Sequence, residues 1–190
     1  ALAYAARLQT SPALIVAQRL ATMGYALPGA VLAVGTVWCL TWLDHRIADA
    51  LDLNRLLLSN TLAALLLAYM VRFLAVGYGP IEAGLQGISR SMDEAARILG
   101  EGTLGRLRRV HLPLLRGTLA TAAALAFVDL MKELPITLMT RPFGWDTLAV
   151  RVFEMTSEGE WERAALPAVA IALVGLLPVF LLIRQTDARH

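Results

Sequence analysis

The chain has few of the residues that catalysis needs. Its one cysteine, Cys39, excludes an internal disulfide and any cysteine-based metal cluster. Its one lysine, Lys132, is followed by glutamate, so the phosphate-binding pattern G-x-x-x-x-G-K-(S/T) is absent and ATP hydrolysis through such a loop is excluded. His111 and His190 are isolated, no H-E-x-x-H pattern occurs, and no serine or cysteine nucleophile has a base nearby in the sequence. These absences argue against an enzyme.

Charged residues are also scarce, at 17% of the chain, while hydrophobic residues make up 57% and the mean hydropathy is +0.61. One soluble core of 190 residues could not bury this much apolar surface, so lipid is the expected solvent. A helix needs roughly 20 mostly apolar residues to cross a bilayer. Four segments approach that length and predict an all-α membrane helix bundle: Ala26 to Leu43, Leu56 to Val76, Leu119 to Leu138 and Leu166 to Ile183.

A fifth apolar segment, Ala1 to Leu8, is too short to cross a bilayer. No basic region precedes it and no cleavage site follows it, so it does not resemble a signal peptide. It resembles the end of a span that begins upstream. We therefore expect a fragment of a longer protein, with four complete spans and the end of a fifth.

The arginines are distributed unevenly between the two sides that alternating spans would define. Ten lie on the side of the central segment, residues 81–117: Arg7, Arg19, Arg90, Arg97, Arg106, Arg108, Arg109, Arg116, Arg184 and Arg189. Five lie on the other side: Arg46, Arg55, Arg141, Arg151 and Arg163. The positive-inside rule therefore places residues 81–117 in the cytoplasm and residues 44–54 and 141–163 outside. The net charge of +2 is too small to suggest a nucleic-acid partner.

Helix-breaking and polar residues mark the expected ends of the first two spans. Pro28 should lie in the first turn of the first span, where its missing N–H costs least. Residues 44–52 are polar and should form an external turn after that span. Asn60 and Thr61 should begin the second span, and the run Gly77-Tyr78-Gly79-Pro80 should stop it.

The central segment, residues 81–117, is mixed and charged, and six glycines divide it into short pieces. Ser91 and Glu94 have the spacing of a capping box, which predicts a short helix from Met92 through Leu99 that ends at Gly100. On this helix an apolar stripe should form, with charged residues at its rim. An apolar stripe of this kind can fill a groove on a partner. The stripe comprises Ala95, Ile98 and Leu99, and the rim comprises Glu94, Arg97 and Glu101.

The third span contains three charged residues, Asp129, Lys132 and Glu133. Charges within a membrane are costly, so they usually pair and face a bundle interior or an aqueous path. The spacing places Lys132 and Glu133 within reach of Asp129. Two alternatives stay open: a self-neutralising structural cluster near the outer membrane edge, or a lining of an aqueous path through the bundle. The later acidic segment, residues 154–162, is better explained as a solvated face than as a metal site.

One motif in the central segment is specific. The pattern E-A-A-x3-G-x9-(I/V)-x-L-P resembles the cytoplasmic loop by which membrane permeases of ABC importers dock on their ATPases. Every fixed position is filled, although a valine stands where isoleucine is usual. The residues are Glu94, Ala95, Ala96, Gly100, Val110, Leu112 and Pro113.

The resemblance extends over almost the whole chain, which is similar to the five-helix core of type I ABC importer permeases. Several segments resemble the C-terminal half of iron(III) importer permeases, which are typically fused pairs of such cores: residues 24–29, 131–138, 141–143 and 146–149. The resemblance implies a multi-pass protein of the bacterial inner membrane. It also implies cytoplasmic ATPase subunits that bind the ATP, a periplasmic binding protein and a second permease core. No cofactor is expected in this chain.

The cargo that the resemblance suggests is iron(III), with thiamine, a polyamine or a phosphonate as alternatives. Iron(III) prefers hard oxygen ligands, and the predicted spans offer only Asp129 and Glu133, so we expect the binding protein to select the cargo. A membrane-embedded enzyme or a passive channel is the alternative outside this family. The need for a co-purifying ATPase separates an importer from both.

Overall fold

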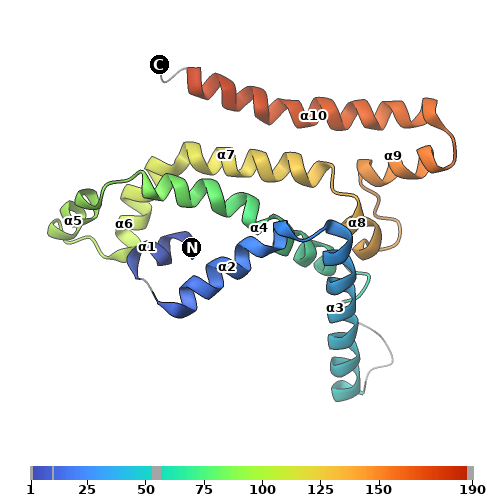
Figure 1. The fold of residues 1–190 in the computed structure, drawn as a ribbon, viewed down its shortest axis with the longest axis horizontal. Coiled ribbons are helices and arrows are strands. Elements are labelled where there is room, and N and C mark those ends of the chain that lie inside the picture. Colours follow the sequence, from blue (N-terminus) through green and yellow to red (C-terminus); the bar gives the residue numbers. More distant parts are fainter. Residues whose placement is uncertain (1, 10, 53–56, 188–190) are drawn as a thin grey trace.

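The computed structural model describes residues 2–9, 11–52 and 57–187, and every regular element in these ranges is helical (Figure 1). The N-terminal half contains α1 (Leu2–Leu8), α2 (Pro12–Ala26), α3 (Gly29–Leu51) and α4 (Leu62–Gln86). Two short helices follow, α5 (Arg90–Ile98) and α6 (Thr103–Arg106), and then a π-helical turn, η1 (Leu107–His111). The remainder comprises α7 (Leu112–Met131), α8 (Pro135–Thr140), α9 (Leu148–Ser157) and α10 (Trp161–Asp187).

Within the part of the chain that the structure describes, three stretches of helix are long and apolar enough to cross a membrane: Leu62–Gln86, Thr103–Met131 and Trp161–Phe180. The bent pair α2 and α3 gives a fourth if it counts as one span. The fold is therefore the expected all-α, polytopic bundle. In the most apolar window of the last stretch only 6% of residues are buried within the chain, which leaves its surface for lipid or for another subunit.

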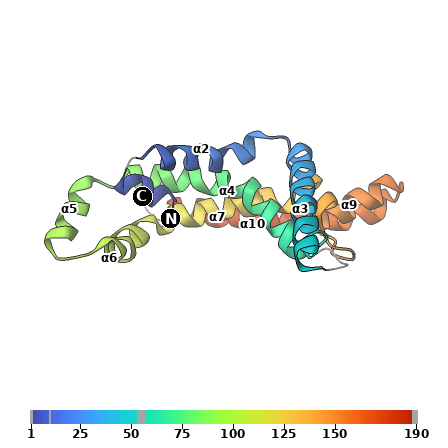
Figure 2. The same cartoon turned by 90° about the horizontal axis from the view of Figure 1, so that it is seen from below.

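The long helices lie side by side. In Figure 2 α2, α4 and α7 run in nearly the same direction, whereas Figure 1 shows α2 inclined to α4; α10 lies along α7. The short helices α5 and α6 lie at one end of this layer, and α8 and α9 lie at the other. Helix α3 leaves the layer steeply and packs against α8 and α4. The segment that carries the predicted docking motif, residues 94–113, and the charged residues at the end of α7 therefore lie far apart along the layer.

Close helix contacts depend on glycines at two positions. A Cβ added to Gly24 would lie 2.2 Å from the carbonyl oxygen of Val71, so α2 could not approach α4 as closely with any other residue. A Cβ added to Gly84 would lie 2.8 Å from side-chain atoms of Leu115 and Thr118 on α7. Small residues at helix contacts are typical of membrane bundles, in which packing rather than hydrophobic burial holds helices together.

Helix α3 covers most of the span that we expected over Ala26 to Leu43, but it begins at Gly29, after Pro28, and a further helix, α2, precedes it. Helix α2 ends at Ala26, α3 begins at Gly29, and the two are bent by 118°. The sequence analysis did not predict α2, although its start carries a recognisable signal. Ser11 accepts a hydrogen bond from the N–H of Leu14, and Pro12 occupies the first turn.

The polar residues that we expected in an external turn continue α3 to Leu51 instead. Asp44 explains the difference, because it is 1% exposed and its carboxylate accepts three backbone hydrogen bonds. The donors are the N–H groups of Leu57, Leu58 and Ser59, at 2.9, 2.8 and 2.6 Å. A buried carboxylate with three donors is stable on a helix. Residues 53–56 of the expected turn, including Arg55 and the expected start of the second span at Leu56, lie outside the described residues.

Helix α4 begins directly after Asn60 and Thr61, the polar residues that we expected at the start of the second span, but it does not stop at residues 77–80. Its N-cap is Thr61, whose hydroxyl accepts the N–H of Ala64, and it continues through Pro80 to Gln86. A glycine inside a helix costs about 1 kcal/mol and a proline about 3 kcal/mol, so packing can outweigh them. Tyr78 and Leu85 supply that packing, since both are buried in a cluster with α1 and α7.

The third span lies closer to the N-terminus than we predicted, since we expected it over Leu119 to Leu138. Helix starts at Thr103, runs through η1 into α7 and ends at Met131. Pro135 then opens the separate helix α8, because it has no N–H to continue the ladder. The last span agrees with the prediction, since Leu166 to Ile183 lies within α10.

Candidate functional site

Helix α5 carries the start of the predicted docking motif, so we call it the docking helix, and it ends as the sequence predicts. Gly100 has a φ of +82°, and the N–H of Gly100 bonds to the carbonyl of Arg97 at 2.9 Å. The N–H of Glu101 bonds to the carbonyl of Ala96 at 3.0 Å. These bonds form a Schellman motif, which requires a left-handed residue and therefore favours glycine.

The start of α5 differs from the prediction. The N-cap is Ser89, and neither it nor Ser91 caps the helix through a side chain, so the capping box of Ser91 and Glu94 does not form. The hydroxyl of Ser91 lies 2.9 Å from that of Ser89 instead. Arg7 determines the earlier start, because its Nη2 donates to the carbonyls of Ile88 and Ser89 at 2.7 and 3.2 Å and so fixes the turn before the helix.

The outer face of α5 is apolar and unpartnered within the described chain. Ile98 is 86% exposed and Leu99 is 82% exposed, and Glu94 and Ala95 beside them are also exposed. Ala96 is buried, at 6% exposure. The alanines of the motif therefore have different positions: Ala95 belongs to the free face, and Ala96 packs against the rest of the protein.

The later motif residues follow on the next helix. Val110 is half-buried in η1, and Leu112 and Pro113 are exposed at the start of α7. The segment between helices α4 and α6 spans residues 87–102, which is shorter than the expected loop of residues 81–117 because helix extends into it from both sides.

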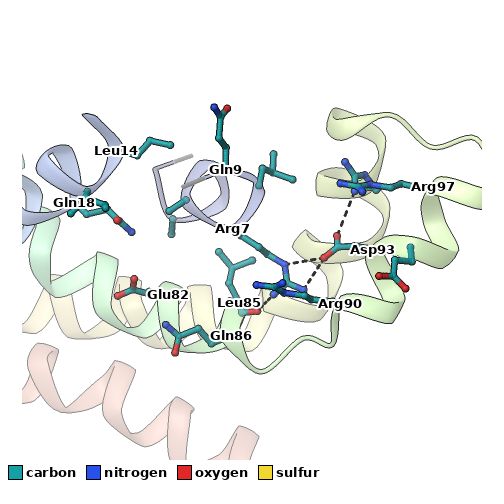
Figure 3. Close-up of a pocket in the computed structure, with 16 residues that line it drawn as sticks. Arg7, Gln9, Leu14, Gln18, Glu82, Leu85, Gln86, Arg90, Asp93 and Arg97 are labelled. Atoms are coloured by element: carbon teal, nitrogen blue, oxygen red, sulfur yellow. Dashed lines mark hydrogen bonds and ion pairs between the residues drawn. The ribbon is translucent and has the colours of Figure 1, made fainter. Parts of the chain in front are cut away.

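Asp93 holds α5 in place, and the sequence analysis missed it. Its carboxylate lies 2.8 Å from Nη2 and 3.0 Å from Nε of Arg7 on α1, and 2.7 Å from Nε2 of His111 on η1. Nη1 of Arg106 on α6 lies 4.0 Å away. Figure 3 shows the guanidinium of Arg7 directed at the carboxylate of Asp93. We call this group of four side chains, Arg7, Asp93, Arg106 and His111, the Asp93 cluster.

The Asp93 cluster is mostly removed from water. Burial alone would raise the pKa of Asp93, but the hydrogen bonds and charges of Arg7 and His111 outweigh burial and hold that pKa below its ordinary value. His111 is fully buried, and Tyr4 packs on its ring with the centroids 5.0 Å apart. The Tyr4 hydroxyl donates to the carbonyl of Thr103 at 3.1 Å. Helix α1 therefore fixes both ends of the docking segment.

A cavity of about 630 Å³ opens beside the Asp93 cluster, between α1, α2, α4 and α5 (Figure 3). Basic, acidic and amide side chains share its wall, among them Arg90, Arg97, Glu82 and Gln86. Glu94 and Arg97 of α5, both exposed, stand at the edge of this cavity. Helix α5 therefore borders a partly polar cavity here rather than closely packed side chains.

The three charged residues expected inside the third span lie instead at the end of α7 and just after it. Lys132 pairs with Asp129 at 2.9 Å, as the spacing predicts. Glu133 does not join them in an ion pair, because its partner is Arg72 of α4, with 3.9 Å between Nε and the carboxylate. Lys132 has 67% of its side chain exposed, whereas Glu133 is 8% exposed. The predicted single cluster is therefore two pairs.

The segment after α8 is held by arginine pairs. Arg141 pairs with Asp146 and, at 2.8 Å, with Glu154 of α9. Arg163 pairs with Glu160 at 2.7 Å. Across the described ranges, no group of three or more His, Cys, Asp or Glu side chains is placed to hold a metal ion.

Comparison with known proteins agrees with the motif. Residues 3–189 match the family described as binding-protein-dependent transport system inner membrane component. The Fe(3+)-transport system permease protein FbpB 2 of Haemophilus influenzae is 30% identical over 164 residues, which cover 86% of this chain and 30% of that protein. The putative 2-aminoethylphosphonate transport system permease protein PhnV of Salmonella typhimurium is 34% identical over 161 residues, which cover 84% of this chain and 58% of that protein.

The chain therefore spans about a third of the length of FbpB 2 and a little over half of PhnV. The family match, together with the apolar helices, makes it a multi-pass protein of the inner membrane. The chain belongs to the family of inner-membrane permease components of binding-protein-dependent ABC importers.

Proposed function

We propose that this chain forms one transmembrane core of an ATP-driven importer and docks a cytoplasmic ATPase through α5. The observation that carries the proposal is the pair Ile98 and Leu99, which are more than four-fifths exposed on a helix that the Asp93 cluster holds firmly. A fixed helix with a free apolar face suits insertion into a partner's groove. A fixed helix can also transmit a displacement of the partner to α7, into which η1 leads.

The partners follow from that role. ATP would be bound by the ATPase, and this chain would need no cofactor of its own. A periplasmic binding protein would deliver the cargo, and a second core, fused or separate, would complete the path. The family description, which names binding-protein-dependent transport, supports this arrangement.

For the cargo we propose iron(III). The similarity to the permease FbpB 2, named for Fe(3+) transport, supports it. A phosphonate is the second candidate, because the relative PhnV is 34% identical and is named for 2-aminoethylphosphonate transport. With the binding protein as the selecting component, the same core could serve either cargo.

For the charges beside α7 we propose that Asp129 and Lys132 face the path. Lys132 is mostly exposed, and Asp129 contributes to a cavity of about 550 Å³ whose wall is otherwise largely apolar. Glu133 is buried, so we expect it to support the wall of this cavity from behind rather than to face the cavity.

The test is co-purification of the ATPase encoded with this chain, followed by uptake in vesicles that contain the whole transporter. Wild-type protein should retain the ATPase, whereas Glu94→Arg should release most of it while membrane insertion is unchanged. Equal ATPase recovery for both proteins would contradict docking through α5. Uptake of iron(III) measured beside uptake of 2-aminoethylphosphonate, with the cognate binding protein present, then decides between the two cargoes.

A further inference from the structure

The bend between α2 and α3 is surrounded by polar contacts. We call residues Tyr25 to Gly29 the elbow, since α2 ends at Ala26 and α3 begins at Gly29 with a bend of 118°. The last carbonyl groups of a helix have no partner within the helix. In the elbow, the carbonyl of Leu27 accepts a hydrogen bond from Nη1 of Arg72, which belongs to α4.

Arg72 makes two further contacts from the same guanidinium. Its Cζ lies 5.3 Å from the centre of the Tyr25 ring, within cation–π range. Its Nε lies 3.9 Å from the carboxylate of Glu133, in the break between α7 and α8. Arg72 thus joins the elbow to that break.

Glu133 is held in a defined position. One carboxylate oxygen accepts the N–H of Ile136 at 3.2 Å and so caps the first turn of α8. The same oxygen would lie 3.2 Å from a Cβ added at Gly29, so the glycine lets the elbow approach the carboxylate closely. On the other side of the elbow, the Tyr25 hydroxyl donates to Asp129 at 3.1 Å.

The contact between Arg72 and Glu133 is incomplete. Their side chains are 16% and 9% exposed, and a separation of 3.9 Å is too long for a hydrogen bond. Nε of Arg72 is buried without any hydrogen-bond partner. A buried, unsatisfied donor is costly. The hydrogen bond between these two groups is therefore not made in this structure, although a small movement of either helix would make it.

We propose that Arg72 and Glu133 form a latch that fixes the elbow against the break between α7 and α8, and that this latch opens once in each transport cycle. Arg72 is a positioning residue in this proposal, which rests on the proposed function as an importer. Opening would free α3 and α8 to move relative to α2 and α4. Movement of that kind is what alternating access requires of a core.

The test measures ATP hydrolysis and cargo uptake together in the intact transporter. In the wild type, hydrolysis should depend on the cargo-loaded binding protein. Arg72→Met should open the latch, so hydrolysis without binding protein should rise at least threefold and uptake per ATP should fall at least tenfold. Glu133→Gln keeps an oxygen for the N–H of Ile136, so it should insert normally and show the same uncoupling. The double variant should be no worse than the worse single variant, because both remove one contact.

Arg46→Met is the matched control. Arg46 also lies 5.3 Å from an aromatic ring, that of Trp42, but it is on the exposed surface of α3 away from the elbow. It should leave coupling unchanged. Hydrolysis and uptake that fall in proportion in Glu133→Gln, or single effects that add in the double variant, would overturn the latch. A wild-type protein that retains no ATPase would overturn the proposed function instead.

Discussion

The docking end and the elbow both depend on buried arginine–carboxylate contacts, but the two regions use them differently. At the docking end Asp93 has two close partners, Arg7 and His111, at 2.8 and 2.7 Å, whereas Arg106 lies 4.0 Å away. Buried polar atoms without a hydrogen-bond partner occur in both regions: Nε and Nη1 of Arg106 and Nδ1 of His111 beside Asp93, and Nε of Arg72 at the elbow. The difference lies at the carboxylates, because Asp93 accepts direct hydrogen bonds from two side chains and Glu133, 3.9 Å from Arg72, accepts none from its arginine. Our proposals make the docking end a rigid lever and the elbow a movable joint.

The largest expected effect follows from removal of the Asp93 cluster. Asp93→Ala would leave Arg7 and the buried Arg106 without their carboxylate, and breaking a buried pair from one side costs about 3 kcal/mol or more. We expect a lower unfolding temperature in detergent and loss of most ATPase binding. Glu94→Ala, one residue along on the exposed face, is the control and should leave the unfolding temperature unchanged. Equal unfolding temperatures for wild type and Asp93→Ala would contradict a rigid lever.

A somewhat smaller effect is expected where α2 packs on α4, near the elbow. Gly24→Ala would place a methyl group 2.2 Å from a backbone oxygen, and relief of such overpacking costs about 2 kcal/mol. Gly35→Ala is the matched control in α3, because no atom lies within 4 Å of its added Cβ. It should be neutral or stabilising by up to about 1 kcal/mol. Thermal unfolding of the two variants side by side provides the measurement, and equal destabilisation would show that the close approach is not needed.

A third substitution tests the backbone conformation at the end of α5. Gly100→Ala keeps the fold of α5 but forces alanine to a φ of +82°, at a cost of about 1 kcal/mol. We expect a modest loss of stability and a several-fold loss of ATPase recovery, because the end of α5 would shift. Gly102→Ala, at a neighbouring glycine with negative φ and open space, should change neither quantity. The prediction fails if both variants behave alike.

Much of the docking helix could be predicted from sequence because its signals are local. The stop at Gly100, the exposed pair Ile98 and Leu99, and the helical character of the whole chain all follow from spacing and composition. The Asp93 cluster could not be predicted, because Arg7 and Asp93 are 86 residues apart and only the packing of α1 brings them together. The false capping box has the same origin, since Arg7 determines where α5 begins.

The elbow was missed for a related reason. Composition shows that residues 12–51 are apolar but not that two helices meet there at 118°. The pairing of Glu133 with Arg72 also depends on tertiary structure, whereas the pairing of Asp129 with Lys132 is local and was predicted. Proline was an informative signal at Pro135, where helix α8 begins. It was misleading at Pro80, because α4 continues past it with Tyr78 and Leu85 packed in a buried cluster.

The smallest expected effect is a pH dependence confined to the docking end. Because the folded pKa of Asp93 lies below its ordinary value of 3.8, the charged carboxylate stabilises the fold above that pH. This contribution is lost as the pH falls through the lowered folded pKa. We expect the difference in unfolding temperature between wild type and Asp93→Asn to be constant from about pH 7 to 5 and to shrink below about pH 4. A difference that grows on acidification would have the wrong sign for a lowered pKa.

The most direct test of the central claim is recovery of the ATPase by the double variant Ile98→Asp, Leu99→Asp. Both side chains are exposed on α5, so the substitutions should leave insertion and unfolding temperature unchanged while ATPase recovery falls by about a hundredfold. Phe143→Asp, at a fully exposed aromatic residue beyond α8 and away from α5, is the control and should retain the ATPase in full. Wild-type recovery of the ATPase by the double variant would contradict docking through α5.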